Sequence, residues 1–253
     1  MNIDDLKTHK FVTECWNDSM GMRRKHKELG IDPMSDSVNE LEFYTYRVGH
    51  ALAHLLTWIE QLQEAPTYLA DFNYSGKARK SGITRARYLL YTVENYLIRL
   101  QSIYDRCLQL TNCVFHLCIE DSNVGHSLVV SNLQVSRTDI PSHLKRVRKA
   151  VAGKQSDRNK IVHQASYQEK ELDRLLLFYI YDESTWDEAQ SGTPFKNLAI
   201  MRSQLLRKVV AEKRSEFEAI NTELFEAIGL LLDKFLPHYR KHVKKVSTYV
   251  SAT

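Results

Sequence analysis

The stretch DRNKIVHQ (residues 157–164) holds three side chains whose types and spacing could do chemistry on a phosphate: Arg158, Asn159 and His163. A histidine has a reference pKa of about 6.5, so it can act as an acid or a base near neutral pH. An arginine is permanently charged and offers a planar fork of donors to phosphate oxygens. The stretch therefore predicts proton transfer beside a bound phosphate. The simpler alternative is an ordinary solvent-exposed start of a helix.

The residues around this stretch predict where its helix begins. Gly153 ends the preceding helical pattern, and Ser156 and Asp157 are both good N-cap residues. Arg158 and Asn159 would then lie in the first helical turn. The free backbone N–H groups and the positive end of the helix dipole attract anions there. We therefore expect a phosphate site at the start of this helix.

Helical periodicity also predicts which way the motif side chains point. Asn159 and His163 are four residues apart and share one face. Arg158 lies about 140° away from His163 around the helix, although its long side chain can fold over the N-terminal end. We expect Ile161 and Val162 to anchor the helix on the core while the polar groups face outward.

Two long apolar patterns predict the helices that must position this site. Residues 37–63 repeat apolar side chains at steps of three, four and seven, and residues 66–82, with a proline and two glycines, read as a loop. Residues 83–119 carry two adjacent apolar stripes, which predict a long, mostly buried central helix. The first stripe is Val93, Leu97, Leu100, Tyr104, Cys107, Val114 and Cys118, and the second is Leu89, Tyr96, Ile103, Leu110 and Leu117.

The second half of the chain predicts further helices. One should begin near Pro141 and stop at Gly153. Residues 169–183 are ambiguous between a strand and a buried helix end, and a final helix should run from about residue 195 to 235 and end at Pro237. We predict an all-α fold, with a peripheral N-terminal segment (residues 1–35) and one helical domain (residues 36–253).

Composition narrows the class of protein. The chain has 253 residues, a formal net charge of +4, nine glycines and five prolines, which are too few for a sandwich or barrel with many tight turns. The four cysteines, Cys15, Cys107, Cys113 and Cys118, form no CxxC pair and are expected to be small buried residues in a reducing compartment. With no apolar signal region and no membrane-length apolar run, we expect a cytoplasmic protein without a membrane partner.

The motif and its place behind a long central helix resemble the HEPN superfamily (higher eukaryotes and prokaryotes nucleotide-binding proteins). The segments YTVENYLIRLQSIYDR (91–106) and RNKIVHQASY (158–167) look most like bacterial stand-alone HEPN proteins, over about residues 40–235. The resemblance implies a helical bundle and, as in many HEPN proteins, a metal-independent endoribonuclease that acts as a homodimer. It also implies a role as a toxin or antiviral defence effector, which an antitoxin or another regulatory partner could control.

This resemblance assigns roles to particular residues. Arg158, Asn159 and His163 would be catalytic, and Glu94 and Asn95 on the central helix are candidates for supporting polar residues. The basic residues nearest the motif would hold RNA: Lys145, Arg146, Arg148, Lys149 and Lys160. The alternatives are a HEPN module that binds RNA or a nucleotide without cleaving it, and a helical adaptor protein.

No cofactor or metal site is expected from the sequence. His50 and His54 have the i, i+4 spacing of two zinc ligands, but the glutamate of an HExxH motif and a third ligand are not evident near them. The sequence also shows no glycine-rich phosphate loop and no GxSxG motif. These features argue against nucleotide-hydrolysing enzymes and serine hydrolases.

Overall fold

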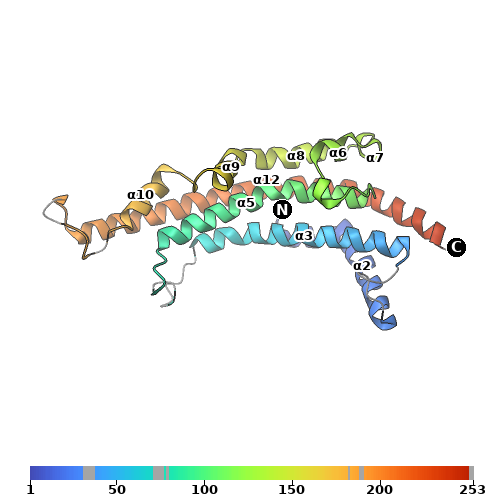
Figure 1. Ribbon diagram of the computed structural model, residues 1–253, viewed down its shortest axis with the longest axis horizontal. Coiled ribbons are helices and arrows are strands. Elements are labelled where there is room, and N and C mark those ends of the chain that lie inside the picture. The colour runs from blue at the N-terminus through green and yellow to red at the C-terminus, as the bar shows by residue number, and fades with distance from the viewer. Residues whose placement is uncertain (31–37, 71–76, 78–79, 182, 188–190, 251–253) are drawn as a thin grey trace. The chain divides into compact units, whose positions relative to one another are not determined.

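The computed structural model describes residues 1–30, 38–70, 77, 80–181, 183–187 and 191–250, and all regular structure in these residues is helical (Figure 1). The all-α prediction is confirmed. The helices are α1 (Ile3–Lys7), α2 (Lys10–Leu29), α3 (Glu40–Ala70), α5 (Arg85–Val114), α6 (His126–Ser131), α7 (Leu133–Ser136), α8 (Ile140–Ala152), α9 (Gln155–His163), α10 (Lys170–Phe178) and α12 (Phe195–Val250), with a 3-10 turn at Asp121–Asn123. None of the described helices is both long enough and apolar enough to span a membrane.

The chain divides into two compact units. Unit 1 comprises residues 1–61, 100–153 and 222–253, and unit 2 comprises residues 62–99 and 154–221. The three long helices α3, α5 and α12 each contribute to both units. Helix α9, which carries the motif, belongs to unit 2, whereas the basic residues of α8 belong to unit 1. The boundary expected after residue 35 lies outside the described residues, and that division stays a prediction.

Helix α5 is the long buried helix that the apolar stripes predict, but it ends at Val114 and not at residue 119. The backbone leaves the helix because His116 and Cys118 adopt positive φ angles of 48° and 54°. The Asn112 side chain holds this turn, donating to the Ile119 carbonyl at 2.8 Å and accepting from its N–H at 3.1 Å. Cys118 is exposed as a result, so its expected burial was wrong, while the other three cysteines are buried.

The first two helices contribute to the core of unit 1. Phe11 of α2 is fully buried, with its ring centroid 5.8 Å from that of Phe235 and 5.9 Å from that of Tyr239. Helices α2 and α3 approach closely at Gly49, where a Cβ atom would stand 2.6 Å from the Ser19 hydroxyl oxygen. A larger residue at position 49 would therefore separate the two helices.

Helix α3 continues through Pro66 to Ala70, so the prediction of a loop was wrong for residues 66–70, and most of its remainder lies outside the described residues. A proline inside a helix leaves the carbonyl four residues earlier without its N–H donor. That carbonyl belongs to Leu62, and the buried Asn221 side chain of α12 donates to it at 2.8 Å. The same amide accepts a hydrogen bond from the Tyr96 hydroxyl at 3.0 Å. Asn221 thus joins α3, α5 and α12 within unit 2 and lets the helix pass the proline.

Helix α12 likewise continues through Pro237 to Val250, and the prediction that it ends there was wrong. An internal proline costs a helix about 3 kcal/mol. Beyond it, Tyr239 and Val246 are buried in unit 1, and the Tyr239 hydroxyl donates to Asp18 at 2.7 Å. Burial of these two side chains offsets the cost of the proline. Residues 169–183, which the sequence left ambiguous, form helix α10 followed by irregular chain.

We predict that Asn221 stabilises unit 2 mainly because of Pro66. The Asn221→Leu variant keeps the side-chain size but leaves the Leu62 carbonyl unpaired and leaves the Tyr96 hydroxyl only its longer hydrogen bond, 3.4 Å to the Phe217 carbonyl. This should lower the free energy of unfolding by about 1–3 kcal/mol. Urea unfolding measures this loss, and Asn197→Leu, at an exposed position of the same helix, is the matched control.

The double variant Pro66→Ala/Asn221→Leu tests the cause. Alanine restores a backbone donor to the Leu62 carbonyl, so the cost of Asn221→Leu should be smaller in the Pro66→Ala background than in the wild type. Equal costs in both backgrounds would show that Asn221 does not act through the proline.

Candidate functional site

Helix α9 begins at Gln155, one or two residues before the predicted start, with Lys154 at the N-cap. Arg158 is therefore the fourth helical residue, and its N–H already donates to the Lys154 carbonyl at 3.1 Å. Asp157 lies in the first turn, with its carboxylate 3.9 Å from Lys154 Nζ. The expected phosphate site at free backbone N–H groups of the motif was thus wrong. An anion at the motif must be bound by side chains.

The three motif side chains lie at or near the surface of α9. Arg158 is half-buried, and Asn159 and His163 are exposed. Arg158 Nη1 donates to Asn159 Oδ1 at 3.1 Å, and Arg158 Nε is buried without a hydrogen-bond partner in the described part of the chain. His163 is the last residue of the helix, one turn beyond Asn159. The structure thus joins Arg158 to Asn159 directly and leaves the imidazole open to solvent.

Apolar packing does not hold α9 in place. None of its residues is buried: Ile161 is half-buried and the Val162 side chain is 46% exposed. The expected anchoring of the helix by this apolar pair was therefore wrong. A nine-residue helix with seven polar residues offers too little apolar surface to fix its own position.

Ion pairs and hydrogen bonds hold both ends of α9 instead. Before its first residue, Lys154 forms an ion pair with Glu216 of α12. After its last residue, the Tyr167 N–H donates to Glu94 of α5 at 2.8 Å. Of the two expected supporting residues, Glu94 thus contacts the chain that follows the motif. The carbonyl of the other, Asn95, accepts from Arg99 at 3.5 Å.

The centre of this network is the buried side chain of Lys213 on α12. Its ammonium group lies 2.8 Å from Glu169, 2.8 Å from Glu216 and 3.1 Å from the Tyr167 hydroxyl. It also lies 5.2 Å from the centroid of the Tyr167 ring. We call these side chains, with Lys154 and Glu94, the Lys213 network. All of them belong to unit 2.

The charges in the Lys213 network stabilise one another. Burial alone would lower the pKa of Lys213, but its hydrogen bonds to Glu169, Glu216 and Tyr167 outweigh burial and raise that pKa above its ordinary value. Burial would raise the pKa of Glu216, but the hydrogen bonds from Lys154 and Lys213 lower it. Lys213 and Glu216 are therefore both charged at neutral pH.

Lys213 was not among the residues expected from the sequence, although the spacing of buried residues along α12 indicates it. Val209, Lys213, Phe217 and Asn221 follow one another at steps of four, and all four are buried. A lysine on an otherwise apolar stripe indicates a buried ion pair, because a charge is rarely buried alone. Neither the spacing nor the residue type identifies its partners Glu169 and Tyr167.

The residues expected to hold RNA are all exposed. Lys145, Arg146, Arg148 and Lys149 lie on the outer face of α8, whose opposite face buries Leu144, Val147 and Val151. The Arg148 guanidinium lies 6.0 Å from the centroid of the Tyr104 ring in unit 1. Lys160 is exposed on α9 in unit 2.

We predict that Lys213→Met lowers the free energy of unfolding by about 1.5–3 kcal/mol, because it removes the buried hydrogen-bond donor of the half-buried carboxylates of Glu169 and Glu216. Lys208→Met is the matched control on the same helix. Lys208 is 53% exposed, and its pair with Glu171 at 3.6 Å should contribute about 1 kcal/mol or less.

The difference in the free energy of unfolding between the wild type and Lys213→Met should also depend on pH. The folded-state pKa of Glu216 is lowered, so its contribution is complete above the unfolded glutamate pKa of about 4.3 and is lost as the pH falls through the folded value. The difference should therefore shrink between pH 7 and pH 3. A difference that stays constant over this range would contradict a charged network.

Comparison with known proteins places this helical arrangement in a family. The Cthe2314-like HEPN family model matches residues 30–213, which include α3, α5, the motif helix α9 and Lys213. Helices α1 and α2 and most of α12 lie outside the match. No curated protein and no solved structure matches the chain. Because the family match covers more than half of its residues, the chain belongs to the Cthe2314-like HEPN family.

Proposed function

We propose that this HEPN protein is a metal-independent endoribonuclease whose catalytic residues are Arg158, Asn159 and His163. HEPN domains are often ribonucleases. The observation that carries the proposal is the exposure and pairing of the motif side chains. The His163 imidazole is open to solvent, and the buried Arg158 Nε finds no acceptor among the described residues. A basic group held this way is suited to bind a phosphate from outside the protein.

In the proposed reaction RNA supplies its own nucleophile. The ribose 2′-oxygen attacks the adjacent phosphorus while its proton passes to an imidazole, and the bond to the 5′-oxygen breaks as that oxygen receives a proton. The products carry a 2′,3′-cyclic phosphate and a 5′-hydroxyl. His163 is the proton-transfer group, Arg158 stabilises the charge on the phosphate, and Asn159 orients Arg158 through the hydrogen bond they share.

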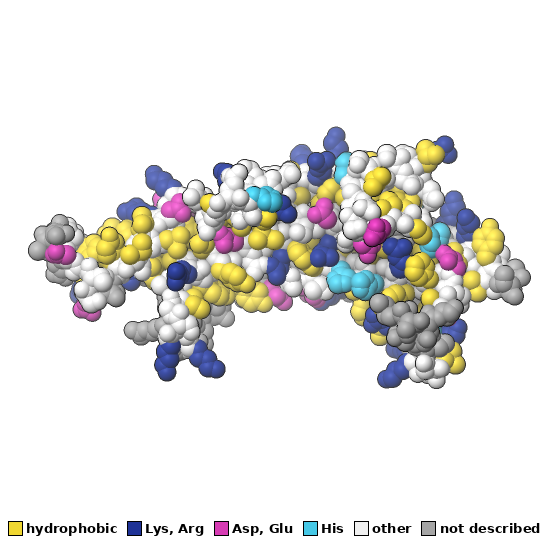
Figure 2. Space-filling model, in the orientation of Figure 1, with side chains coloured by type: hydrophobic (Ala, Val, Ile, Leu, Met, Phe, Trp, Pro, Cys, Tyr) yellow, Lys and Arg dark blue, Asp and Glu magenta, His cyan; other side chains and the backbone are white. Residues whose placement is uncertain are grey.

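Two copies of the motif would complete this chemistry. One motif has one imidazole, whereas the reaction needs both a base and an acid. Unit 2 also exposes apolar side chains in and after the motif helix, as an interface between protein chains does: Val162, Leu177, Ile180 and Tyr181. Hydrophobic side chains are visible at the surface over α10 in Figure 2. We therefore propose a homodimer that brings two α9 helices together.

The remaining elements of the proposal concern RNA and regulation. The exposed residues Lys145, Arg146, Arg148, Lys149 and Lys160 would bind the RNA backbone through its phosphates. A nuclease of this kind would act as a toxin or as an antiviral defence effector. An antitoxin or another regulatory partner would then restrain it.

We predict that His163→Ala and Arg158→Ala fold like the wild type but cleave RNA about 10²–10⁴-fold more slowly, because each removes one group that acts on the transition state. Gln164→Ala, at the next exposed position, is the matched control. EDTA should leave the wild-type rate unchanged, and a substrate with 2′-deoxyribose at the scissile position should resist cleavage.

Arg158→Lys separates charge from geometry, since it keeps the positive charge but removes the planar fork. We expect most of the activity to be lost in this variant. Full activity in His163→Ala would end the catalytic assignment of this histidine. RNA binding without cleavage by the wild type would leave an RNA- or nucleotide-binding HEPN module as the function.

We predict that the protein sediments as a dimer at micromolar concentration and that Val162→Glu weakens both the dimer and cleavage, because it places a charge on the exposed face of α9. Leu128→Glu, at an exposed apolar position of α6 in unit 1, should change neither. A wild-type monomer that still cleaves RNA would contradict a site formed from two motifs.

A further inference from the structure

Unit 1 contains a hollow of about 510 Å³ that the RNA-cleavage proposal does not use. It lies along α3 and α5, and its polar lining includes Arg47, His50 and His54 from α3 and Arg106 and Gln109 from α5. In Figure 2, histidine side chains lie over α3 with basic side chains beside them. We call this hollow the arginine hollow.

Aromatic rings hold the arginines of this region in fixed orientations. The Arg106 guanidinium lies 4.1 Å from the centroid of the Trp58 ring, and that of Arg47 lies 5.5 Å from the centroid of Phe43. A guanidinium that packs on an aromatic ring can keep its in-plane N–H groups available as donors. Arg106 Nε is buried and has no hydrogen-bond partner among the described residues. The hollow therefore presents positive charge, and its Arg106 has one N–H group that no described residue accepts from.

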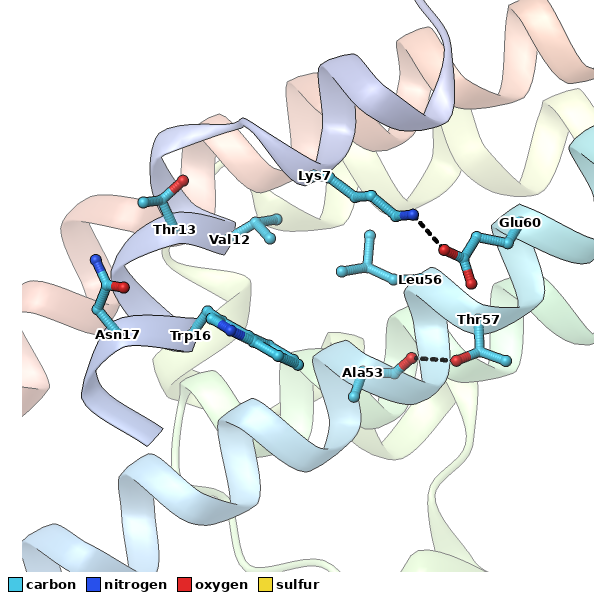
Figure 3. Close-up of a pocket in the computed structure, with 9 residues that line it drawn as sticks. All are labelled: Lys7, Val12, Thr13, Trp16, Asn17, Ala53, Leu56, Thr57 and Glu60. Atoms are coloured by element: carbon cyan, nitrogen blue, oxygen red, sulfur yellow. Dashed lines mark hydrogen bonds and ion pairs between the residues drawn. The ribbon is translucent and has the colours of Figure 1, made fainter. Parts of the chain in front are cut away.

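Acidic groups of the described residues interact only weakly with these arginines. Arg47 lies 3.8 Å from the carboxylate of Asp121, whose side chain is 77% exposed. At that distance in water, the pair contributes little. The hollow of Figure 3, between α2 and α3, differs in this respect, because its Lys7 is paired with Glu60 across the opening.

The two histidines add a group that responds to an anion. Their Nε2 atoms lie 3.2 Å apart. Burial lowers the pKa of His50, and His54 and Arg23 lower it further, while Asp121 opposes them. In the described residues, no set of three or more His, Cys, Asp or Glu side chains is placed to hold a metal ion. Protonation of this pair would instead be favoured by an anion bound in the hollow.

An exposed tryptophan lies next to this charged surface. His50 and His54 also line a smaller hollow together with Arg23 and Trp16. Trp16 is 47% exposed, and in Figure 3 its indole extends from α2 toward α3. Aromatic faces beside cationic groups are typical of surfaces that bind single-stranded nucleic acids, since bases stack on the rings while the cations bind phosphates.

We propose that the arginine hollow binds the phosphate of a nucleotide or of a single-stranded nucleic acid. Arg47 and Arg106 hold the phosphate oxygens, and the histidine pair donates to the same anion. Where the ligand is a strand, a neighbouring base stacks on Trp16. This site lies in unit 1, does not include the motif of α9, and does not depend on RNA cleavage.

Calorimetric titration of the full chain at low salt with AMP and with a six-residue 2′-deoxy oligonucleotide tests the proposal. The oligonucleotide has no 2′-hydroxyl, so it measures binding alone. Arg106→Gln and Arg47→Gln should each weaken binding by about 10- to 100-fold, the effect of losing a hydrogen bond to a charged group. Arg137→Gln, at an exposed arginine elsewhere in unit 1, should bind like the wild type.

Trp16→Ala distinguishes the two sources of the phosphate. A loss of about 10-fold or more for the oligonucleotide, with AMP unchanged, identifies a strand-binding site. If Trp16→Ala binds AMP as tightly as the wild type does, and the wild type binds the oligonucleotide no more tightly than AMP, the hollow is a nucleotide site. The proposal is overturned if neither ligand binds the wild type, or if both arginine variants bind like the wild type.

The pH dependence of oligonucleotide binding provides an independent check. A phosphodiester does not titrate between pH 6 and pH 8, so any change in affinity reports protein groups. Binding should tighten as the pH falls, because a bound anion favours the protonated form of His50, whose pKa is lowered in the free protein. The charged and titratable groups around His50 are Arg23 of α2, Tyr46, Arg47 and His54 of α3, Arg106 and Cys113 of α5, and Asp121. An affinity that stays constant between pH 6 and pH 8 would show that the histidines do not bind the anion.

Discussion

The buried ammonium group of Lys213 is the interaction on which the motif helix depends. Helix α9 has no buried side chain, so its position comes from the polar contacts at its two ends. Lys213 contacts Glu169, after the helix, and shares Glu216 with Lys154, before it. Removing this buried ammonium group is more costly than losing a surface pair, because the half-buried carboxylates that remain are only partly solvated. The network therefore gives a short polar helix a defined place.

This way of holding α9 leaves its own side chains available. A helix anchored by an apolar stripe must turn that stripe inward, and the faces beside it become crowded. Here the anchors lie outside the helix, so Asn159, Val162 and His163 all remain exposed. Asn221, eight residues after Lys213, has a comparable role, since its amide supplies the donor that Pro66 cannot give to Leu62. The part of α12 in unit 2 thus uses two buried polar residues to hold neighbouring helices.

The two units carry different chemistry. Unit 2 holds the motif that gives the HEPN family its proposed catalytic groups, and unit 1 holds the arginine hollow and the basic face of α8. In the arginine hollow, Arg106 and Arg47 lie beside aromatic rings, and the ion pair of Arg47 with Asp121 is long and exposed, whereas in unit 2 the buried Lys213 contacts two carboxylates. An unpaired, oriented cation is suited to bind a ligand, and a paired one is suited to hold structure.

The sequence by itself determined the helical class, the buried stripes of α5 and the limits of α8 at Pro141 and Gly153, because these features depend on local periodicity and capping. It also identified the motif and, through it, the family. The tertiary structure alone decided how α9 is held, and that α3 and α12 continue through their prolines. The physical reason is the same in these cases. A break in a helix, or a short polar helix, is stabilised by contacts from residues far away in the chain, as with Leu62 and Asn221, which lie 159 positions apart. Local sequence carries no record of such partners.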